Sequence, residues 1–551
     1  MTSVANAALT EPITHHEKLD RDSISPEPSN RRSDVVFEDF LYYAAIQRRE
    51  EDGGRPPASN WFTRLSEHKG RNVNVDVTDA KPPPMTEDEE EAANASRALR
   101  LASWAAVFYL ITTDILGPFN APYAISQVGW VPGNLTVPFE DQLLIGLVTE
   151  GVVLYFVMGV MALYTGLILW RLYVRLDSPR YPLKTYADIA ERIFGRTARH
   201  ICNVLQSLQL LINVATICLS NGQALSQIAN FKNYGWLANS AVWLNLLIIF
   251  TSMGFVAHSP PNFMAAKTSL GVDKGPVVTA EFTTLPLFLK VNGIMQMVFA
   301  YGGAMIFPEM MAEMRRPMDF WKGMACAQAL IFAAYLLYGC FVYAFQGQFT
   351  LPLAFQGVSK FAWQTLGNVL ALITGIIAAG LYGNIGIKVI YINIIEDWFH
   401  GPRLMTHKGR IIWTILVCIY WSLAFIVGSA IPQVQTITGL IAAIAIMQFT
   451  YSFPPLLRLG YDVITDAMAH DNVHVPGNGP AARVDTWRDW SRWKRGLFSG
   501  RILFKLFNLI LFLGGMVMAC LGMWGAGESI KAAFANDGAA TSFGCKSPLQ
   551  G

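Results

Sequence analysis

The sequence predicts an all-α membrane protein that crosses the bilayer many times. Hydrophobic residues make up 52% of the 551 residues and charged residues only 15%, whereas soluble domains carry roughly 25% charged residues. Ten apolar segments are each long enough to cross about 30 Å of hydrocarbon as a helix. The seven cysteines show no CxxC or metal-like spacing, so neither a disulfide framework nor a metal site is expected.

Residues 1–100 are predicted to form a mostly disordered cytoplasmic tail, because they are polar and rich in proline. Within the tail, residues 34–50 (DVVFEDFLYYAAIQRRE) have the pattern of an amphipathic helix. That helix could pack on the body of the protein, lie on the membrane or form only transiently. No apolar stretch typical of a signal peptide opens the chain, so the first span is expected to direct insertion.

The membrane-embedded core is predicted to occupy residues 101–460. A cytoplasmic loop at 461–499, a last span at 500–527 and an extracytoplasmic tail at 528–551 follow it. The ten apolar segments are 103–129, 142–170, 200–229, 238–257, 290–314, 322–346, 363–395, 411–430, 433–457 and 500–526.

Lysine and arginine in the short loops predict the orientation, because cytoplasmic loops carry an excess of both. They gather in four loops, which are therefore placed inside, whereas 347–362 offers only Lys360 and is placed outside. The N-terminus is then inside and the C-terminus outside. The sequon at Asn134 lies in an outer loop and is a glycosylation candidate, although so short a motif often matches by chance. The four basic loops are 171–199, 315–322, 396–410 and 458–501.

Two of the apolar segments are interrupted in the same way. Gly117 precedes Pro122 by five residues, and Gly303 precedes Pro308 by five. Glycine and proline break a helix, and in hydrocarbon a break is tolerated only where it contacts protein or lines a cavity. Paired breaks in corresponding spans indicate the binding site of a secondary transporter. The alternative is two unrelated proline kinks.

The third apolar segment carries a polar stripe formed by Gln206, Gln209, Asn213 and Thr216, which fall within an arc of about 80° on one helix face. Such a stripe faces protein or water rather than lipid. It either lines a substrate path or bonds neighbouring helices.

The number of apolar segments is inconsistent with the predicted orientation of the loops. Between the cytoplasmic loops at 171–199 and 315–322 it must be even, yet only three apolar segments lie there. One crossing is therefore missing, or one segment does not span. We predict about ten helices, with a vacancy beside residues 238–257.

A set of motifs, given at the end of this paragraph, resembles the amino acid/auxin permease family, particularly its fungal neutral amino acid permeases. The resemblance implies a leucine-transporter-like fold of two inverted five-helix repeats plus one C-terminal helix, and proton-coupled uptake of amino acids. It also implies that the missing helix is the fourth, between Ala229 and Lys232. The motifs are 110–123 (LITTDILGPFNAPY), 127–130 (QVGW), 220–223 (SNGQ), 234–239 (YGWLAN), 299–303 (FAYGG), 308–309 (PE) and 380–388 (GLYGNIGIK).

The break in the first span offers fixed partial charges of both signs to a zwitterion. The inner half ends in unpaired carbonyls at Ile111 to Asp114, which suit an ammonium group. Beyond Pro118, the outer half begins at Asn120 with free amides, which suit a carboxylate. Gly117 lets the ligand approach the backbone closely.

The second break is not equivalent, because Glu309 already places an anion in the first turn of its inner half. The substrate carboxylate is therefore assigned to the first break, and the ammonium also to carbonyls near Phe299 and Tyr301. These two aromatic residues would wall the side-chain pocket, or else face lipid. Gly302 and Gly303 complete the backbone of this break. No lysine or arginine belongs to the motifs of this pocket, which favours neutral substrates, although Asp114 leaves basic ones open.

Proton coupling is assigned to Asp114 and Lys388. In the fold that the resemblance implies, the helix that carries Asp114 and the helix that carries Lys388 approach each other where related carriers hold sodium. The lysine ammonium would then replace the sodium ion. The alternative is that Lys388 extends to the cytoplasmic surface.

The sequence therefore predicts a carrier that imports neutral amino acids by proton symport. The plasma membrane is the expected location and the vacuolar membrane the second. A sensor of the same fold without transport is the alternative, whereas no arrangement typical of an intramembrane enzyme is present in the sequence. Neither a cofactor nor a nucleic-acid partner is expected; the partners are the amino acid, the proton and the bilayer.

Overall fold

The computed structural model of the protein describes most of the membrane-embedded core and part of each flanking region. Regular structure in these ranges is helical, and β contacts there are limited to two isolated bridges. The all-helical prediction is confirmed for this part of the chain. Asn134 and Gly117 lie outside the described residues. The described residues are 35–51, 100, 102–115, 118–129, 151–225, 241–280, 283–402, 404, 406–430, 434–469, 471 and 484–537.

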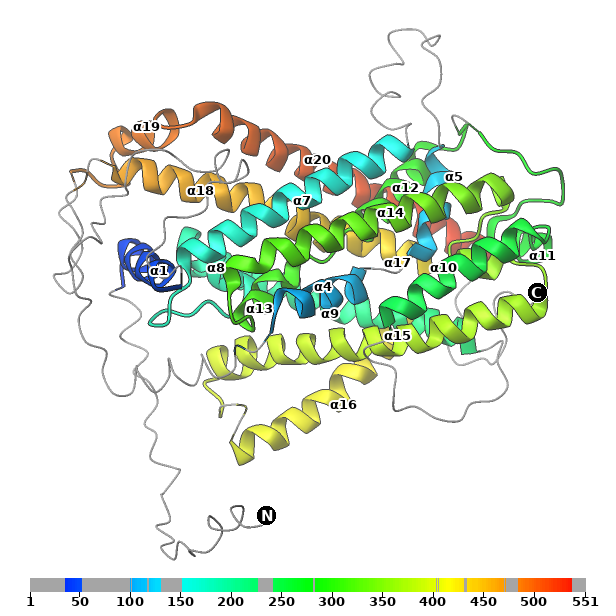
Figure 1. The fold of residues 1–551 in the computed structure, drawn as a ribbon, viewed down its shortest axis with the longest axis horizontal. Helices are drawn as coiled ribbons and strands as arrows, with labels where there is room; N and C mark the ends of the chain where they lie inside the picture. Colours follow the sequence, from blue (N-terminus) through cyan, green and yellow to red (C-terminus); the bar gives the residue numbers. More distant parts are fainter. Residues whose placement is uncertain are drawn as a thin grey trace, which may run out of the picture.

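Each predicted apolar segment contains at least one helix, and the helices lie lengthwise beside one another (Figure 1). Seven helices in the described part are long and apolar enough to cross a membrane, and the segment 243–257 is a shorter apolar helix. The first and fifth segments are each divided into two shorter helices. The helices of these segments are α4 (Trp104–Ile115), α5 (Ala121–Val128), α7 (Gly151–Leu176), α9 (Arg196–Leu225), α10 (Ala241–Ala257), α12 (Leu287–Ala300), α13 (Phe307–Ala312), α14 (Phe320–Gln346), α15 (Phe361–Ile390), α16 (His407–Ala430), α17 (Val434–Ile441), α18 (Phe453–Met468) and α20 (Ile502–Asp537).

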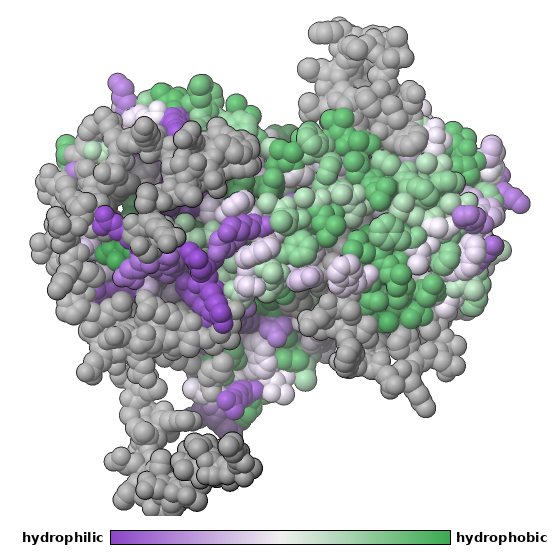
Figure 2. Space-filling model, in the orientation of Figure 1, coloured by the Kyte–Doolittle hydropathy of each residue, from purple (hydrophilic) through white to green (hydrophobic). Residues whose placement is uncertain are grey.

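The four basic loops lie at the same end of the molecule. The indole of Trp170, near the end of α7, donates to the carbonyl of Pro317 at 3.0 Å, and the indole of Trp398 donates to His200 Nδ1 at 3.1 Å. The inner part of α18 packs against α8 (Tyr186–Phe194). Hydrophobic residues cover the middle of the face shown in Figure 2, and hydrophilic residues gather toward the end that holds α1 and α8. This grouping agrees with the predicted orientation.

Two consecutive helices, α9 and α10, run in the same direction. His200 at the start of α9 contacts Trp398 beyond the end of α15, so α9 is antiparallel to α15. Phe255 at the end of α10 stacks on Trp363 at the start of α15, with ring centroids 4.6 Å apart, so α10 is also antiparallel to α15. Consecutive spans must alternate in direction, and the described part of the chain holds no helix between α9 and α10 that runs the opposite way. This geometry supports the prediction that one crossing is missing.

An apolar stripe on α10 is uncovered. Trp243, Leu247 and Phe250 are 64%, 46% and 60% exposed, and they recur at the spacing of one helix face. A Cβ added to Gly254, farther along the same face, would have no heavy atom within 4 Å. This stripe lies on the helix beside which a vacancy is predicted.

Helix α1 (Phe37–Glu51) forms within the predicted tail and packs on the body. Arg48 Nε donates to the carbonyl of Val174 at 3.1 Å, and the ring of Phe40 lies 5.3 Å from that of Tyr181. Of the three alternatives for residues 34–50, the structure therefore shows packing on the protein. The hydrophobic positions Leu41 and Tyr42 are buried there, which compensates the ordering of the helix.

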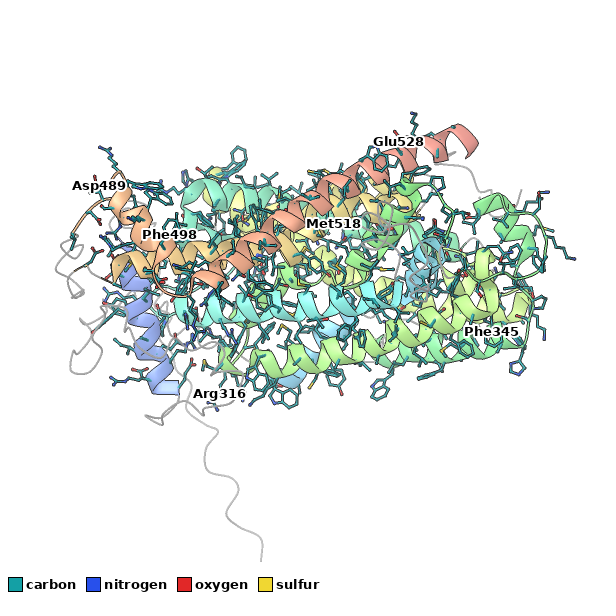
Figure 3. All side chains as sticks on the ribbon, turned by 90° about the horizontal axis from the view of Figure 1, so that it is seen from above. Arg316, Phe345, Asp489, Phe498, Met518 and Glu528 are labelled. Carbon is teal, nitrogen blue, oxygen red and sulfur yellow. The ribbon has the colours of Figure 1, made fainter. Side chains whose placement is uncertain are left out.

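Two boundaries near the C-terminus differ from the prediction. Within the predicted 461–499 loop, α18 continues to Met468 and a short helix, α19 (Trp490–Phe498), follows. The last helix, α20, continues to Asp537 instead of ending at 527, because the residues after 527 (ESIKAAFAND) are mostly good helix formers. Figure 3 shows α20 running from the end that holds Phe498 to the opposite end, where Glu528 lies.

Candidate functional site

The first interrupted span breaks where its prolines and glycine predict. Helix α4 ends at Ile115, a single 3-10 turn covers Pro118–Asn120, and α5 begins at Ala121. Pro122 sits in the first turn of α5, where its missing N–H costs nothing. The backbone therefore leaves free amides at the start of α5 and free carbonyls at the end of α4. The side chains of residues 113–118, including Asp114 and Pro118, are outside the described part.

The second interrupted span breaks between Ala300 and Phe307. Helix α12 ends at Ala300, a 3-10 turn covers Ala304–Ile306, and α13 begins at Phe307 with Pro308 in its first turn. Gly302 and Gly303 lie in this break and are buried. Both breaks are thus present at the predicted positions.

The two interrupted spans are joined near their breaks by a polar junction. Asn120 Nδ2 donates to Gln296 Oε1 at 3.2 Å, and Thr438 Oγ1 on α17 donates to the same oxygen at 2.9 Å. Gln296 lies one turn before the end of α12 and is 1% exposed. The outer halves of both interrupted spans, α5 and α12, pack along each other. The start of α5 is therefore positioned by a side chain of the other interrupted span.

Asn292 extends this polar face of α12 by one further turn. It is 1% exposed, and its Oδ1 has no hydrogen-bond partner among the described residues. Gly439 on α17 makes room for it, because a Cβ there would lie 2.1 Å from that oxygen. Asn292, Gln296 and Thr438 are site residues that the sequence analysis missed. The available signal was a pair of amides at i and i+4 within an apolar helix.

The predicted pocket residues are distributed around the second break. Ile111 is completely buried in α4, Tyr301 is 1% exposed, and Phe299 packs partly buried against the core. The hydroxyl of Tyr301 donates to the carbonyl of Tyr155 at 3.1 Å, and its ring lies 6.1 Å from that of Tyr335. Tyr301 therefore does not face lipid. Its role as a pocket wall stays a prediction.

The polar stripe on α9 is buried, as predicted. Gln206, Gln209, Asn213 and Thr216 are 0%, 1%, 4% and 5% exposed. Gln206 Nε2 donates to the Met305 carbonyl at 3.0 Å and to Glu309 Oε1 at 2.8 Å. One residue of the stripe, Gln206, therefore bonds α9 to the second break and to α13.

Lys388 contacts the inner end of the second interrupted span. Its Nζ lies 3.5 Å from Glu313 Oε1, and the two side chains are 49% and 61% exposed. Gly380 and Asn384 share its exposed face of α15. The described contacts do not bring Lys388 to Asp114, whose side chain lies outside them.

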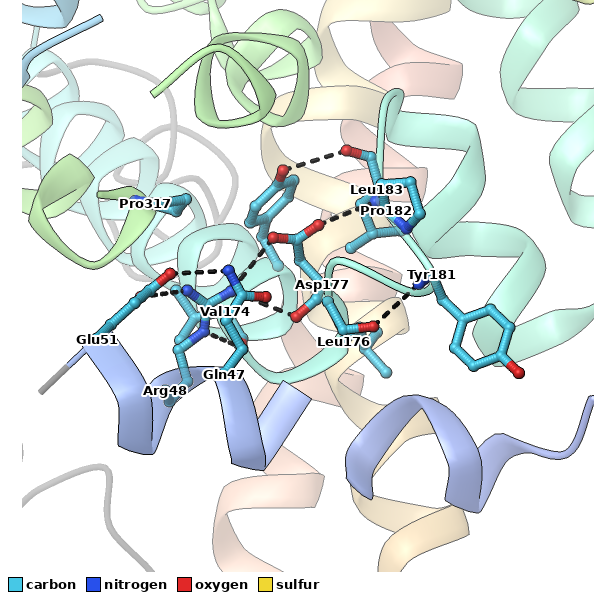
Figure 4. Close-up of polar contacts among 12 residues, drawn as sticks. Gln47, Arg48, Glu51, Val174, Leu176, Asp177, Tyr181, Pro182, Leu183 and Pro317 are labelled. Carbon is cyan, nitrogen blue, oxygen red and sulfur yellow. Dashed lines mark hydrogen bonds and ion pairs between the residues drawn. The ribbon is translucent and has the colours of Figure 1, made fainter. Parts of the chain in front are cut away.

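The inner end of the first interrupted span is held by a buried aspartate (Figure 4). Asp177, after the end of α7, is 0% exposed. Its carboxylate accepts from both terminal nitrogens of Arg100 at 3.1 and 3.2 Å, from Arg48 Nη2 at 3.2 Å and from the amide of Leu183 at 3.0 Å. Ala102, just before α4, pairs with the backbone after α13: its amide donates to the backbone carbonyl of Glu313 at 3.0 Å. The start of α4 is therefore fixed to α1, α7 and the end of α13.

The comparison with known proteins agrees with this arrangement. The family model described as transmembrane amino acid transporter protein matches residues 144–461. A transmembrane transporter of Fusarium pseudograminearum is 22% identical over 478 residues, which cover 81% of this chain and 87% of the relative. The N amino acid transport system protein of Neurospora crassa is 23% identical over 404 residues, 68% of this chain and 79% of the relative.

A plant relative, amino acid transporter AVT1H of Arabidopsis thaliana, is 25% identical over 240 residues, 40% of this chain and 50% of the relative. The family model covers more than half of the chain and includes the second break. The resemblance given by the motifs is thereby confirmed. The chain belongs to the transmembrane amino acid transporter family.

Proposed function

We propose that the chain imports neutral amino acids by proton symport, with alternating access around its two interrupted helices. The observation that carries the proposal is the junction between the breaks, where Gln296 of one interrupted span binds Asn120 of the other at 3.2 Å. Backbone freed at a break is tolerated in a membrane only where it contacts protein or lines a cavity. Two such breaks in spans that are bonded to each other provide opposite helix ends for a zwitterion.

Within this site we assign the substrate carboxylate to the amides at the start of α5, around Asn120. The ammonium group is assigned to the carbonyls at the end of α4, around Ile111, and near Tyr301. Phe299 and Tyr301 wall the side-chain pocket, while Gly302 keeps the backbone accessible. Glu309 is the charged side chain among the described residues of the two breaks, and it is bound by Gln206, so an uncharged substrate side chain is favoured.

The experiment is uptake of a labelled neutral amino acid into vesicles that contain the purified chain, with a panel of unlabelled amino acids as competitors. Competition by neutral but not by acidic or basic amino acids is the expected result. Binding of a neutral amino acid without flux would instead identify a sensor. Competition mainly by lysine or arginine would contradict the assignment to neutral substrates. We place the carrier in the plasma membrane first and in the vacuolar membrane second.

We also propose that the fold is leucine-transporter-like and that its fourth helix is missing from this chain. The parallel directions of α9 and α10 support this, because two consecutive spans of a continuous bundle must alternate. Sequencing transcripts from the source locus tests it: the expected transcript carries additional apolar codons between Ala229 and Asn230. Transcripts that all join these two residues directly, in a working carrier, would refute it.

Lys388→Met is expected to abolish uptake or make it independent of pH, and Asp114→Asn is expected to have the same effect. The reason is that both groups are assigned to proton coupling, Asp114 on the inner half of the first span and Lys388 on α15. The measurement is uptake at a series of external pH values. Stability should change little in Lys388→Met, because an exposed ion pair such as Lys388–Glu313 contributes about 0–1 kcal/mol.

Lys267→Met is the matched control, since Lys267 forms an exposed pair with Asp273 at 2.8 Å, distant from both breaks in the sequence. It should leave the pH profile unchanged. An unchanged profile in both Lys388→Met and Asp114→Asn would contradict the coupling role and leave Lys388 as a surface residue paired with Glu313.

A further inference from the structure

The carboxylate of Glu309, on α13, has one oxygen that accepts hydrogen bonds and one that does not. Its Oε1 accepts from Gln206 Nε2 at 2.8 Å and from the amide of Tyr186 at 3.3 Å. Its Oε2 is buried and has no hydrogen-bond partner among the described residues. The residue as a whole is only partly buried.

No described lysine, arginine or histidine lies within 4 Å of this carboxylate, so its charge is not neutralised by an ion pair. The charged groups of α8, which packs against α13, are engaged elsewhere. Asp188 accepts from the amides of Lys184 and Thr185 at 2.9 Å, and both Asp188 and Glu191 pair with Arg199, at 3.6 and 2.6 Å. Arg192 donates to backbone carbonyls.

The other elements packed on α13 also provide no counter-charge. The 3-10 turn before it (Ala304–Ile306) is apolar. On α7, Gly166 faces Phe307, and Arg175 lies over the ring of Tyr461, with 5.6 Å between its guanidinium carbon and the ring centroid. An isolated carboxylate inside a membrane protein costs several kcal/mol, and binding one proton removes that cost.

Gln206 connects this carboxyl group to the second break. Its Nε2 donates both to Glu309 Oε1 and to the carbonyl of Met305, whereas its own Oε1 has no hydrogen-bond partner among the described residues. A charged carboxylate oxygen is a stronger acceptor than the carbonyl oxygen of a neutral carboxyl group. A proton on Oε2 therefore leaves Oε1 as an acceptor but weakens its hydrogen bond from Gln206 Nε2. The link that Gln206 makes between Glu309 and the Met305 carbonyl is weakened with it.

We propose that Glu309 is a further proton-binding carboxyl group of this carrier, in addition to the coupling residues Asp114 and Lys388, and that Gln206 is the positioning residue that transmits its protonation to the second break. The inference rests on the proposed proton symport. One proton from the outer solution binds the empty Oε2 and leaves to the inner solution; no other bond forms or breaks. In the charged state Gln206 links Met305 firmly to Glu309, and in the neutral state this link is weaker.

The test uses the full chain in proteoliposomes and compares wild type, Glu309→Gln and Asp319→Asn. A glutamine keeps the size of the side chain and cannot ionise, so it holds the neutral state. For a one-proton carrier, a gradient of one pH unit supports about tenfold accumulation. Wild type and the control Asp319→Asn, whose carboxylate is half-buried and paired with Lys322, should show this gradient-driven accumulation. Glu309→Gln should show none and keep counterflow exchange of labelled for unlabelled substrate.

Gln206→Leu supplies the second readout. It removes both bonds of the link between Glu309 and Met305, so gradient-driven accumulation should be lost while counterflow exchange is kept. Gradient-driven accumulation in Glu309→Gln would overturn the assignment. Loss of both counterflow exchange and substrate binding in this variant would also overturn it, because Glu309 would then act on the substrate site. A wild-type chain that exchanges substrate but ignores the pH gradient would instead overturn the proposed symport itself.

Discussion

Replacing Gly302 with valine is expected to abolish uptake while the chain still folds. A Cβ at this position would lie 2.7 and 3.0 Å from the Cγ2 and Cδ1 atoms of Ile446, and 3.1 Å from the carbonyl of Phe299. Ile446 is 1% exposed and has little room to withdraw. Overpacking of this kind costs roughly 1–3 kcal/mol, which the whole bundle can absorb. A displacement of about 1 Å at a site that must position its ligand can reduce a rate by about 10²-fold.

The measurement is the rate of uptake per amount of monodisperse protein recovered from the membrane. Gly514→Val is the matched control, because a Cβ at Gly514 on α20 would have no heavy atom within 4 Å. Gly302→Ala should fall between the control and Gly302→Val. The same loss is expected for Gly117→Val on sequence grounds. If Gly302→Val transports with normal affinity and rate, the second break is a structural kink and the substrate binds elsewhere.

Replacing Asp177 with alanine is expected to cause the largest loss of stability. Asp177 is 0% exposed, and its carboxylate is the shared partner of Arg48 and Arg100, whose side chains are 12% and 10% exposed. Removing one partner of a buried ion pair costs roughly 3–5 kcal/mol, because the remaining charge stays buried without compensation. The variant should also release α1 from the inner end of the bundle. Thermal unfolding in detergent, monitored by tryptophan fluorescence, measures the first effect.

Asp273→Ala is the control for this substitution, since the Asp273 side chain is 81% exposed and its pair with Lys267 contributes little. Limited proteolysis between α1 and α4 measures the second effect and should become faster in Asp177→Ala alone. A melting curve that coincides with that of wild type would show that the two arginines are not held by this carboxylate.

The sequence predicted the features that depend on local chemistry. Glycine and proline clustered within one apolar span favour a break there, and both interruptions were placed correctly. A stripe of amides in an apolar helix must avoid lipid, and the stripe around Gln206 on α9 is buried. The odd number of segments likewise depends on the chain alone, and the parallel α9 and α10 agree with it.

The contacts that assemble the site could not be predicted in the same way. The Asn120–Gln296 bond joins residues 176 positions apart, and the Gln206–Glu309 bond joins residues 103 positions apart. Such pairs depend on how helices rotate against each other, which a single sequence does not record. Glu309 was identified as an ionisable residue, but its partner set required the packing of α9 on the break. The π-helical turn at Ala442–Ile446 also contains no proline or glycine that would indicate it.

The most direct test of the account is uptake of a labelled neutral amino acid into proteoliposomes under an imposed pH gradient, acidic outside. The account predicts accumulation above equilibrium, collapse of that accumulation when a protonophore is added, and substrate-dependent acidification of the vesicle interior. Uptake of the same amino acid that is indifferent to both the gradient and the protonophore would contradict it.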